Sequence, residues 1–237
     1  WRLLGTVLRR HAGDVLGASA AQVFAQMIRS GRQLIVPLYG SRVLGMDAGA
    51  IGTIVSISAV IDMSLFLPAG MLMDRLGRKY ASIPSFLVMA LGMALVPLAD
   101  GFAGLLLATA VIGFGNGLGS GTMMTLGADL APREAAGEFL GLWRLVGDAG
   151  QMAGPLAVGA LAGALGFTVT ALTLSGVGLL AAGTIFVAVQ ETLRAAPSAL
   201  SPAGPHPQPS ATHGARASGR AAPASGGGGP EGREDGR

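Results

Sequence analysis

The residues of this sequence that could do chemistry are polar side chains inside long apolar stretches. One set recurs at spacings of four, three and four residues and so lies on one face of a helix: Gln22, Gln26, Arg29 and Gln33. Asp62 is the acid near the middle of the next apolar stretch. A guanidinium and a carboxylate at that depth could form an ion pair, and the carboxylate could carry a proton.

The depths of Arg29 and Asp62 match if both stretches are helices that cross a bilayer. At 1.5 Å per residue, Arg29 lies about 18 Å from the start of its helix and Asp62 about 17 Å from a charged loop at the same membrane face. Because an arginine at the centre of a membrane helix costs ~2.5–3.5 kcal/mol, Arg29 must face a bundle interior or a water-filled cavity. We therefore predict an Arg29–Asp62 pair, which is either a static link between helices or part of a substrate or proton site. Arg32 lies about 60° off the polar stripe.

The composition places these stretches in a membrane. Hydrophobic residues make up 51% and charged residues 12% of the chain, and the mean hydropathy is +0.57, which is too apolar for a soluble domain. The net charge of +3 does not predict nucleic-acid binding, because the basic residues are scattered at helix ends without aromatic residues between them. No cofactor or metal site is predicted, since cysteine is absent and no phosphate loop or metal-ligand spacing occurs.

Six apolar stretches, each long enough to cross a bilayer, predict an all-α, multi-pass membrane helical bundle. Their approximate ranges are Gly17–Leu38, Ala48–Met73, Ala81–Leu98, Phe102–Leu126, Phe139–Leu161 and Phe167–Val189. We expect Pro37 and Gly40 to end the first helix, Asp47 to cap the second, and Pro68 to bend it.

The fourth and fifth stretches carry further polar and glycine positions. Asn116 lies among closely spaced glycines, a composition that permits close backbone approach or local unwinding: Gly113, Gly115, Gly117, Gly119 and Gly121. The fifth stretch has a polar face formed by Arg144, Asp148, Gln151 and Pro155. These positions could line a substrate path or serve only helix contacts, and the structural alternative is stronger for Arg144 and Asp148, which lie near a helix end.

A charged segment, G-M-L-M-D-R-L-G-R-K-Y from Gly70 to Tyr80, separates the second and third stretches. Its order G-x-x-x-D-R-x-G-R-K is supplied by Gly70, Asp74, Arg75, Gly77, Arg78 and Lys79. The segment resembles the signature loop of the major facilitator superfamily of secondary transporters. The resemblance implies a cytoplasmic gate, in which the glycine permits close helix contact and the acid pairs with a helix end or an arginine of a second half. A loop that only sets topology is the alternative.

A second motif lies in the fifth stretch, where G-Q-M-A-G-P-L-A-V-G runs from Gly150 to Gly159. It resembles the G-x-x-x-G-P-x-x-G-G motif of proton-coupled antiporters through Gly154 and Pro155, with Val158 in place of one glycine. The family resemblance implies two six-helix halves around a central cavity, each built of inverted three-helix repeats. Gly113 stands where an N-terminal half would usually carry arginine, and the chain lacks a starting Met and a further helix after the sixth. We therefore expect the C-terminal half of a twelve-helix fold.

The basic residues predict the orientation of the bundle in the cell membrane. By the positive-inside rule, one side is cytoplasmic because it holds Arg9, Arg10, Arg75, Arg78, Lys79, Arg133 and Arg194. The opposite loops hold Arg42, and six spans place both termini in the cytoplasm. We expect a cytoplasmic lead over 1–16, the transporter half over 17–189, and a disordered cytoplasmic tail over 190–237, which is rich in Pro, Ala, Gly and Ser.

The resemblance implies secondary active transport by alternating access rather than catalysis. Our specific hypothesis is proton-coupled efflux of a drug-like or metabolite substrate, with Asp62 as the proton carrier because it is the only acid near mid-membrane. A histidine proton relay is not expected, because all three histidines lie outside the predicted helices. The expected partners are membrane lipid, the small-molecule substrate, protons and the missing N-terminal six-helix half. The alternatives are a solute uptake symporter of the same family and a non-transporting six-helix scaffold or membrane-embedded enzyme.

Overall fold

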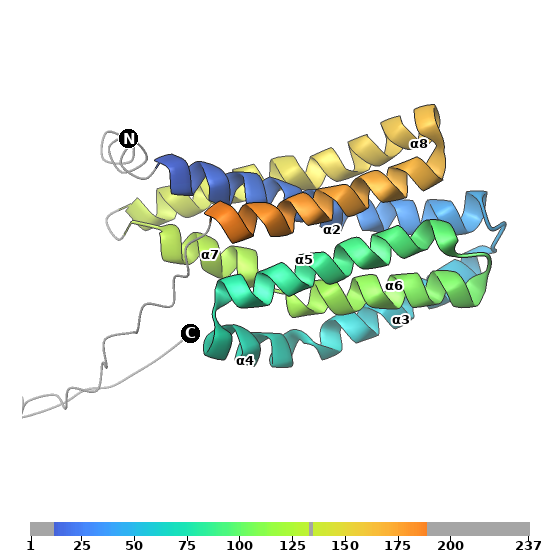
Figure 1. Cartoon of the computed structure of the whole chain (residues 1–237), viewed down its shortest axis with the longest axis horizontal. Helices are drawn as coiled ribbons and strands as arrows, with labels where there is room; N and C mark the ends of the chain where they lie inside the picture. Colours follow the sequence, from blue (N-terminus) through green and yellow to red (C-terminus); the bar gives the residue numbers. More distant parts are fainter. Residues whose placement is uncertain (1–11, 133–134, 189–237) are drawn as a thin grey trace, which may run out of the picture. The chain divides into compact units, whose positions relative to one another are not determined.

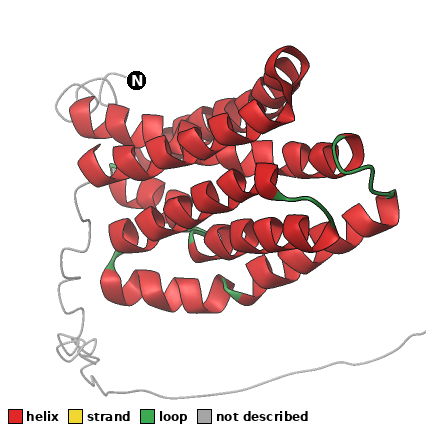
Figure 2. Ribbon diagram, turned by 45° about the vertical axis from the view of Figure 1, so that its right-hand side comes forward, coloured by secondary structure: helices red, strands yellow, loops and turns green. Residues whose placement is uncertain are grey.

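Long apolar runs with few charged residues fold into helices throughout the described part of the chain, which contains no strand (Figures 1 and 2). The computed structural model describes residues 12–132 and 135–188. Most of the predicted lead over 1–16 lies outside these residues. The whole of the predicted tail over 190–237 also lies outside them. The elements are α2 (Ala12–Arg42), α3 (Ala48–Ser64), α4 (Phe66–Leu76), α5 (Arg78–Leu95), the short 3-10 helix η1 (Val96–Leu98), α6 (Phe102–Leu118), α7 (Thr122–Leu130) and α8 (Ala136–Ala188).

Four helical stretches among the described residues are long and apolar enough to cross a membrane, which confirms an all-helical membrane bundle. They are Ala48–Met73, Lys79–Leu98, Phe102–Leu130 and Ala136–Val187. The helix α2, although 31 residues long, is not one of them, because its arginines and glutamines lower its hydropathy. Within α8, Gly166 has a non-helical φ of 84° and ψ of 169°, and the helix doubles back there (Figure 1). We call residues 136–165 the first arm of α8 and residues 167–188 its second arm.

The helix α2 extends further than Pro37 and Gly40 suggest. The expectation that Pro37 and Gly40 end it is wrong, because α2 continues to Arg42 with Pro37 inside. A proline removes one helical hydrogen bond, and neighbouring helices can hold the helix across that gap. Here the buried Tyr39, two residues beyond Pro37, donates a hydrogen bond of 3.2 Å from its hydroxyl to the carbonyl of Pro97.

Two of the predicted spans are broken in their second half. Asp47 caps α3 as expected, since its Oδ1 accepts a 2.9 Å hydrogen bond from the Ala50 amide. The break between α3 and α4 falls at Leu65, because Pro68 has no N–H to offer the carbonyl four residues earlier. The break between α6 and α7 ends at Gly121, whose φ of 79° favours glycine, which confirms the local unwinding that the glycine-rich composition permits.

The glycines of α6 bring its backbone close to two neighbours at once. A Cβ on Gly113 would lie 2.6 Å from the Ser58 carbonyl oxygen of α3, and one on Gly115 would lie 2.7 Å from the Met89 amide of α5. The helix α6 therefore packs between α3 and α5, while α2 packs against both arms of α8. The described helices thus form two three-helix groups. The first group is α2, α3 with α4, and α5, and the second is α6 with α7 and the two arms of α8. The first helix of each group packs mainly against the last two helices of the other group.

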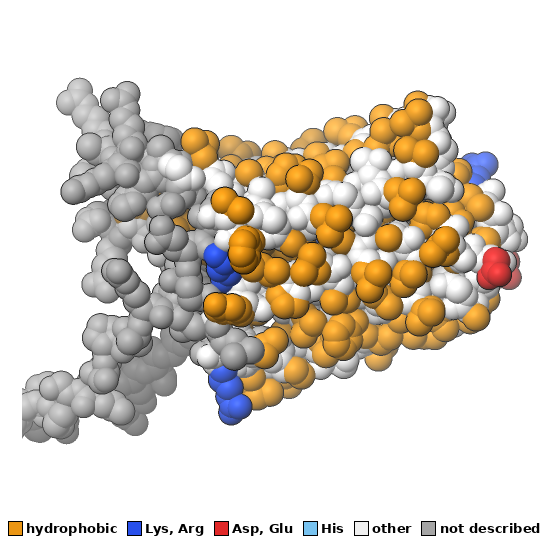
Figure 3. Space-filling view, viewed as in Figure 1, with side chains coloured by type: hydrophobic (Ala, Val, Ile, Leu, Met, Phe, Trp, Pro, Cys, Tyr) orange, Lys and Arg blue, Asp and Glu red, His pale blue; other side chains and the backbone are white. Residues whose placement is uncertain are grey.

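The surface of the bundle suits a lipid environment. Large apolar side chains are exposed along α3 and α4, with Val60 66% and Leu67 82% exposed. Figure 3 shows a face covered by hydrophobic and uncharged side chains, with charged side chains only toward its two ends among the described residues. In water such a surface would be costly, whereas lipid accepts it.

Candidate functional site

The acid of α3 is held on a buried helix face. Ile54, Ser58 and Asp62 recur every four residues and are the buried residues of α3. Ser58 Oγ donates a 2.8 Å hydrogen bond to the Thr109 carbonyl of α6. A Cβ on Gly117 would lie 2.6 Å from the Asp62 carbonyl oxygen, so this glycine allows α6 to approach α3 beside Asp62.

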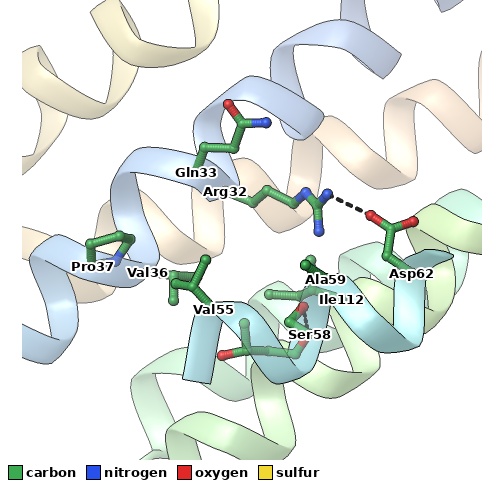
Figure 4. A pocket seen from close by; sticks show the side chains of 10 residues that line it. Arg32, Gln33, Val36, Pro37, Val55, Ser58, Ala59, Asp62 and Ile112 are labelled. Atoms are coloured by element: carbon green, nitrogen blue, oxygen red, sulfur yellow. Dashed lines mark hydrogen bonds and ion pairs between the residues drawn. The ribbon is translucent and has the colours of Figure 1, made fainter. Parts of the chain in front are cut away.

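The Asp62 carboxylate has two partners on different helices. Its Oδ2 lies 3.0 Å from Nη2 of Arg32 (Figure 4). The same oxygen accepts a 2.7 Å hydrogen bond from Nδ2 of Asn116. The Arg32 and Asp62 side chains are 17% and 12% exposed. Oδ1 of Asp62 is buried without a hydrogen-bond partner among the described residues. The carboxylate therefore links α2, α3 and α6 and keeps one oxygen that could accept a proton or a further donor.

The predicted ion pair between Arg29 and Asp62 is wrong. Arg29 Nη2 instead donates a 2.7 Å hydrogen bond to the Gly119 carbonyl, and its guanidinium carbon lies 5.3 Å from the centroid of the Phe86 ring. Depth alone did not decide the pairing, because two residues three positions apart on a helix point in directions about 60° apart. Arg29 points toward α5 and the α6–α7 break, whereas Arg32 points toward α3.

A cavity of about 290 Å³ lies beside the Arg32–Asp62 pair, between α2, α3 and α6 (Figure 4). Gln33, the last member of the predicted stripe, lines it together with Ser58 and Thr109. The ion pair is therefore at the edge of space that water or a small molecule can enter. Among the described residues, no group of three or more His, Asp or Glu side chains is placed to hold a metal ion.

A second cavity, of about 600 Å³, lies between α2, the start of α7 and the first arm of α8. We call it the α2–α8 cavity. The structure brings the predicted polar faces of α2 and the first arm together in its walls, which include Gln22, Gln26, Arg29, Arg144, Asp148 and Gln151. Gln22 is only 5% exposed, and its Oε1 has no hydrogen-bond partner among the described residues. A neighbouring cavity of about 580 Å³ shares Asp148 and Gln151 with it and reaches Gln33 and Pro155.

The glycine-proline motif positions α2 against the first arm of α8. A Cβ on Gly150 would lie 2.8 Å from the Val23 Cα, and one on Gly154 would lie 2.6 Å from the Met27 carbonyl oxygen. Both neighbours are backbone atoms of α2 and cannot rotate away. The motif therefore fixes the closeness of the two helices that form the α2–α8 cavity, while Pro155 next to it is exposed.

The charged loop of residues 70–80 is described only in part. Gly77 has a φ of 104°, which favours glycine between α4 and α5. Lys79 Nζ donates a 2.6 Å hydrogen bond to the Phe186 carbonyl and lies 5.0 Å from the centroid of the Phe186 ring. Lys79 therefore links the start of α5 to the end of α8. Arg75 is exposed, and a Cβ on Gly70 would meet no described atom within 4 Å. The Asp74 and Arg78 side chains lie outside the described part of the chain.

Sequence reasoning missed several residues of the site. An arginine inside an apolar stretch is itself a signal, so Arg32 could have been weighed beside Arg29 as the partner of Asp62. Phe86, which lies against the Arg29 guanidinium, is an ordinary apolar residue in the sequence. Gly119 contributes only its carbonyl oxygen, for which no side-chain pattern exists.

Comparisons with known proteins agree with this architecture. The model of the Major Facilitator Superfamily matches residues 18–223. Two uncharacterised MFS-type transporters from strains of Mycobacterium tuberculosis are each 30% identical to this chain over 135 residues. That alignment covers 56% of the chain and 32% of each relative, so the chain spans about a third of the length of these curated relatives. The family match extends over most of the sequence and includes all or most of every described helix, and the chain belongs to the Major Facilitator Superfamily.

Proposed function

We propose that this chain is one six-helix half of a secondary transporter that works by alternating access. Its passes would be α2, α3 with α4, α5, α6 with α7, and the two arms of α8. Family membership supports transmembrane transport. The packing of α2 on the arms of α8, and of α6 on α3 and α5, supports two three-helix repeats. The short coverage of the relatives supports a second half as partner. An N-terminal half would usually carry arginine at position 113, but the backbone there lies too close to Ser58 for a side chain larger than glycine, which supports the C-terminal half.

The observation that carries the mechanism is the Asp62 carboxylate, buried at mid-span with Arg32 and Asn116 and with one oxygen unpartnered among the described residues. We infer that Asp62 binds and releases the transported proton. When Asp62 is ionised, the Arg32 guanidinium holds α2 to α3. Protonation removes that attraction, so the two helices are free to separate on the side of the neighbouring cavity. The second nearby cation, Arg29, and the uncharged Asn116 complete the polar surroundings of Asp62.

The test needs no known substrate. Single cysteines are introduced into the full-length protein at two positions. One is Ala59, in the cavity beside Asp62, and the other is Leu140, in the α2–α8 cavity. The sequence of this chain contains no other cysteine. Each rate of labelling by a hydrophilic thiol reagent is divided by the rate of the same cysteine in the denatured protein at the same pH, which removes the effect of pH on the thiol itself. When the pH is lowered, the normalised rates should change in opposite directions at the two positions, because alternating access opens one side as it closes the other. Asp62→Asn should remove most of this pH dependence.

Normalised labelling rates that rise or fall together, or that respond to pH equally in Asp62→Asn, would remove the coupling role from Asp62. A non-transporting scaffold also predicts no reciprocal change. The direction of transport that we propose is efflux, because the α2–α8 cavity lies toward the predicted cytoplasmic ends of α7 and α8 and could be loaded from the cytoplasm.

We also propose that the segment Gly70 to Lys79 acts as the cytoplasmic gate. Two of its features support this role: the backbone of Gly77 requires glycine, and Lys79 holds the last turn of α8. The open space beside Gly70 supports a surface that the second half covers in one of the two conformations.

The proposed orientation, with both termini in the cytoplasm, predicts the outcome of a labelling experiment in intact cells. A cysteine at the exposed Ser41 should react with an impermeant reagent from outside, and one at the exposed Arg75 should react only after the cells are permeabilised. The chain has no native cysteine to give background labelling. The reverse pattern would invert the orientation of the bundle.

A further inference from the structure

We propose that the α2–α8 cavity binds an organic anion with an apolar body, and that Arg29 is the residue that holds its anionic group. This proposal rests on the transport function above and names the chemical class of its substrate. The argument has three parts, which are the charge balance of the cavity, the free donors of Arg29, and the lining that surrounds them.

The charges of the α2–α8 cavity do not balance among the described residues. Its walls contain the guanidinium groups of Arg29 and Arg144 and the carboxylate of Asp148. Asp62, the other acid near Arg29, is engaged by Arg32 and Asn116. An excess of positive charge inside a membrane bundle is costly unless an anion compensates it. The cavity therefore favours anions over neutral molecules and cations of the same shape.

Arg29 has donors to spare for such an anion. Among the described residues, its one hydrogen-bond acceptor is the carbonyl of Gly119, and its Nε is buried without a partner. A guanidinium carries five N–H groups in a planar fork that matches a carboxylate. The Phe86 ring covers the Arg29 guanidinium at 5.3 Å, which restricts its orientation before a ligand arrives. The unpartnered Gln22 Oε1 in the same wall is an acceptor, so it could bind a donor group elsewhere on the ligand but not the anionic group itself.

The remainder of the lining suits an apolar, flat body. Met123, Met124, Leu140 and Trp143 form this part of the wall. Trp143 Nε1 donates a 3.0 Å hydrogen bond to the Met123 carbonyl, so the polar atom of this side chain is already satisfied. Methionine side chains adapt to ligands of different shape. A volume of about 600 Å³ is in the range of pockets for small organic molecules.

The experiment compares three probes of one shape and different charge: 2-naphthoate, 2-naphthamide and 2-naphthylmethylammonium. Binding to the full-length protein in lipid nanodiscs is followed by quenching of tryptophan fluorescence, and the same measurement on Trp143→Phe isolates the contribution of Trp143 from that of every other tryptophan. We expect 2-naphthoate to bind at least about tenfold more tightly than 2-naphthamide, since hydrogen bonds to a charged group are the strong ones. Arg29→Gln should abolish this preference, Arg29→Lys should retain part of it, and Arg42→Gln, at the exposed end of α2, should leave it unchanged.

Equal binding of the three probes, preference for the ammonium, or no binding of any probe would overturn the proposal. A carboxylate side chain of the second half that already occupies Arg29 would produce equal binding of the naphthoate and the amide. Survival of the naphthoate preference in Arg29→Gln would also overturn it. The measurement is made at equilibrium without a pH gradient, so its failure leaves the coupling role of Asp62 intact. Conversely, Asp62→Asn should lose pH-dependent labelling but retain the preference for 2-naphthoate.

Discussion

Neutralising either member of the Arg32–Asp62 pair should destabilise the protein by about 3 kcal/mol, and neutralising both should restore most of that loss. Each single change, Arg32→Gln or Asp62→Asn, leaves one charge at mid-span without its partner. The two side chains are 17% and 12% exposed, so little water is present to compensate. The double change removes both charges and keeps groups of similar size that can still form hydrogen bonds with each other and with Asn116.

The measurement is thermal or denaturant unfolding of the four proteins in the same detergent, arranged as a double-mutant cycle. The matched control is the double variant Arg29→Gln with Asp62→Asn, which removes the same two types of charge but leaves Arg32 unpaired. This control should not be rescued, because Arg29 is bound to the Gly119 carbonyl rather than to Asp62. Rescue by the Arg29 variant and not by the Arg32 variant would reverse the assignment of the pair.

Gly154→Ala should be among the most damaging single-methyl additions in the bundle, with an expected loss of about 1–3 kcal/mol. The added Cβ would lie 2.6 Å from the Met27 carbonyl oxygen and 2.7 Å from the Gly31 amide. Both are backbone atoms, so α2 as a whole would have to move away from the first arm of α8. The same movement would deform the α2–α8 cavity.

The chain offers a control on the same arm of α8. A Cβ on Gly159 would meet no described atom within 4 Å, so Gly159→Ala should be neutral or stabilise the helix by about 0.4–1 kcal/mol. Comparison of the melting temperatures of the two variants separates the helix contact from the general effect of alanine for glycine. Equal melting temperatures would show that α2 and α8 are not in contact at Gly154.

Local chemistry explains which features the sequence could predict. The Asp47 cap and the unwinding among the α6 glycines each depend on a few adjacent residues, so their patterns are sufficient. At Pro68 the sequence predicts a bend, and the structure has a break three residues earlier, at Leu65. The family followed from the loop of residues 70–80, whose charges and glycines are specific, and the family match confirms it. The end of α2 was mispredicted because Tyr39 and its contact with Pro97, 58 residues away, hold the helix beyond Pro37.

The partner of Asp62 shows the limit of pattern reasoning at the site. Spacing along the sequence predicts depth in the membrane, and both Arg29 and Arg32 are near the depth of Asp62. The rotation of α2 about its own axis decides between them. That rotation is set by glycines in α8, more than 100 residues later in the chain, where Gly147 and Gly154 lie against Gln22 and Met27. The stripe of α2 alone carries no information about these contacts.

The packing of α2 against helices of the second three-helix group has a consequence for biogenesis. The most polar of the described helices, α2, leaves the ribosome before the others, and the two arms of α8 that bury it are the last of the described helices to be synthesised. Asp62, the partner of Arg32, is synthesised 30 residues after it. Gly119, whose carbonyl accepts the hydrogen bond of Arg29, is synthesised 90 residues after Arg29. During that interval α2 has no hydrophobic advantage in lipid and must be retained by the insertion machinery or at the membrane surface. Ribosome-bound chains that stop before α8 should therefore leave α2 accessible to aqueous reagents, and its integration should coincide with the emergence of the second arm.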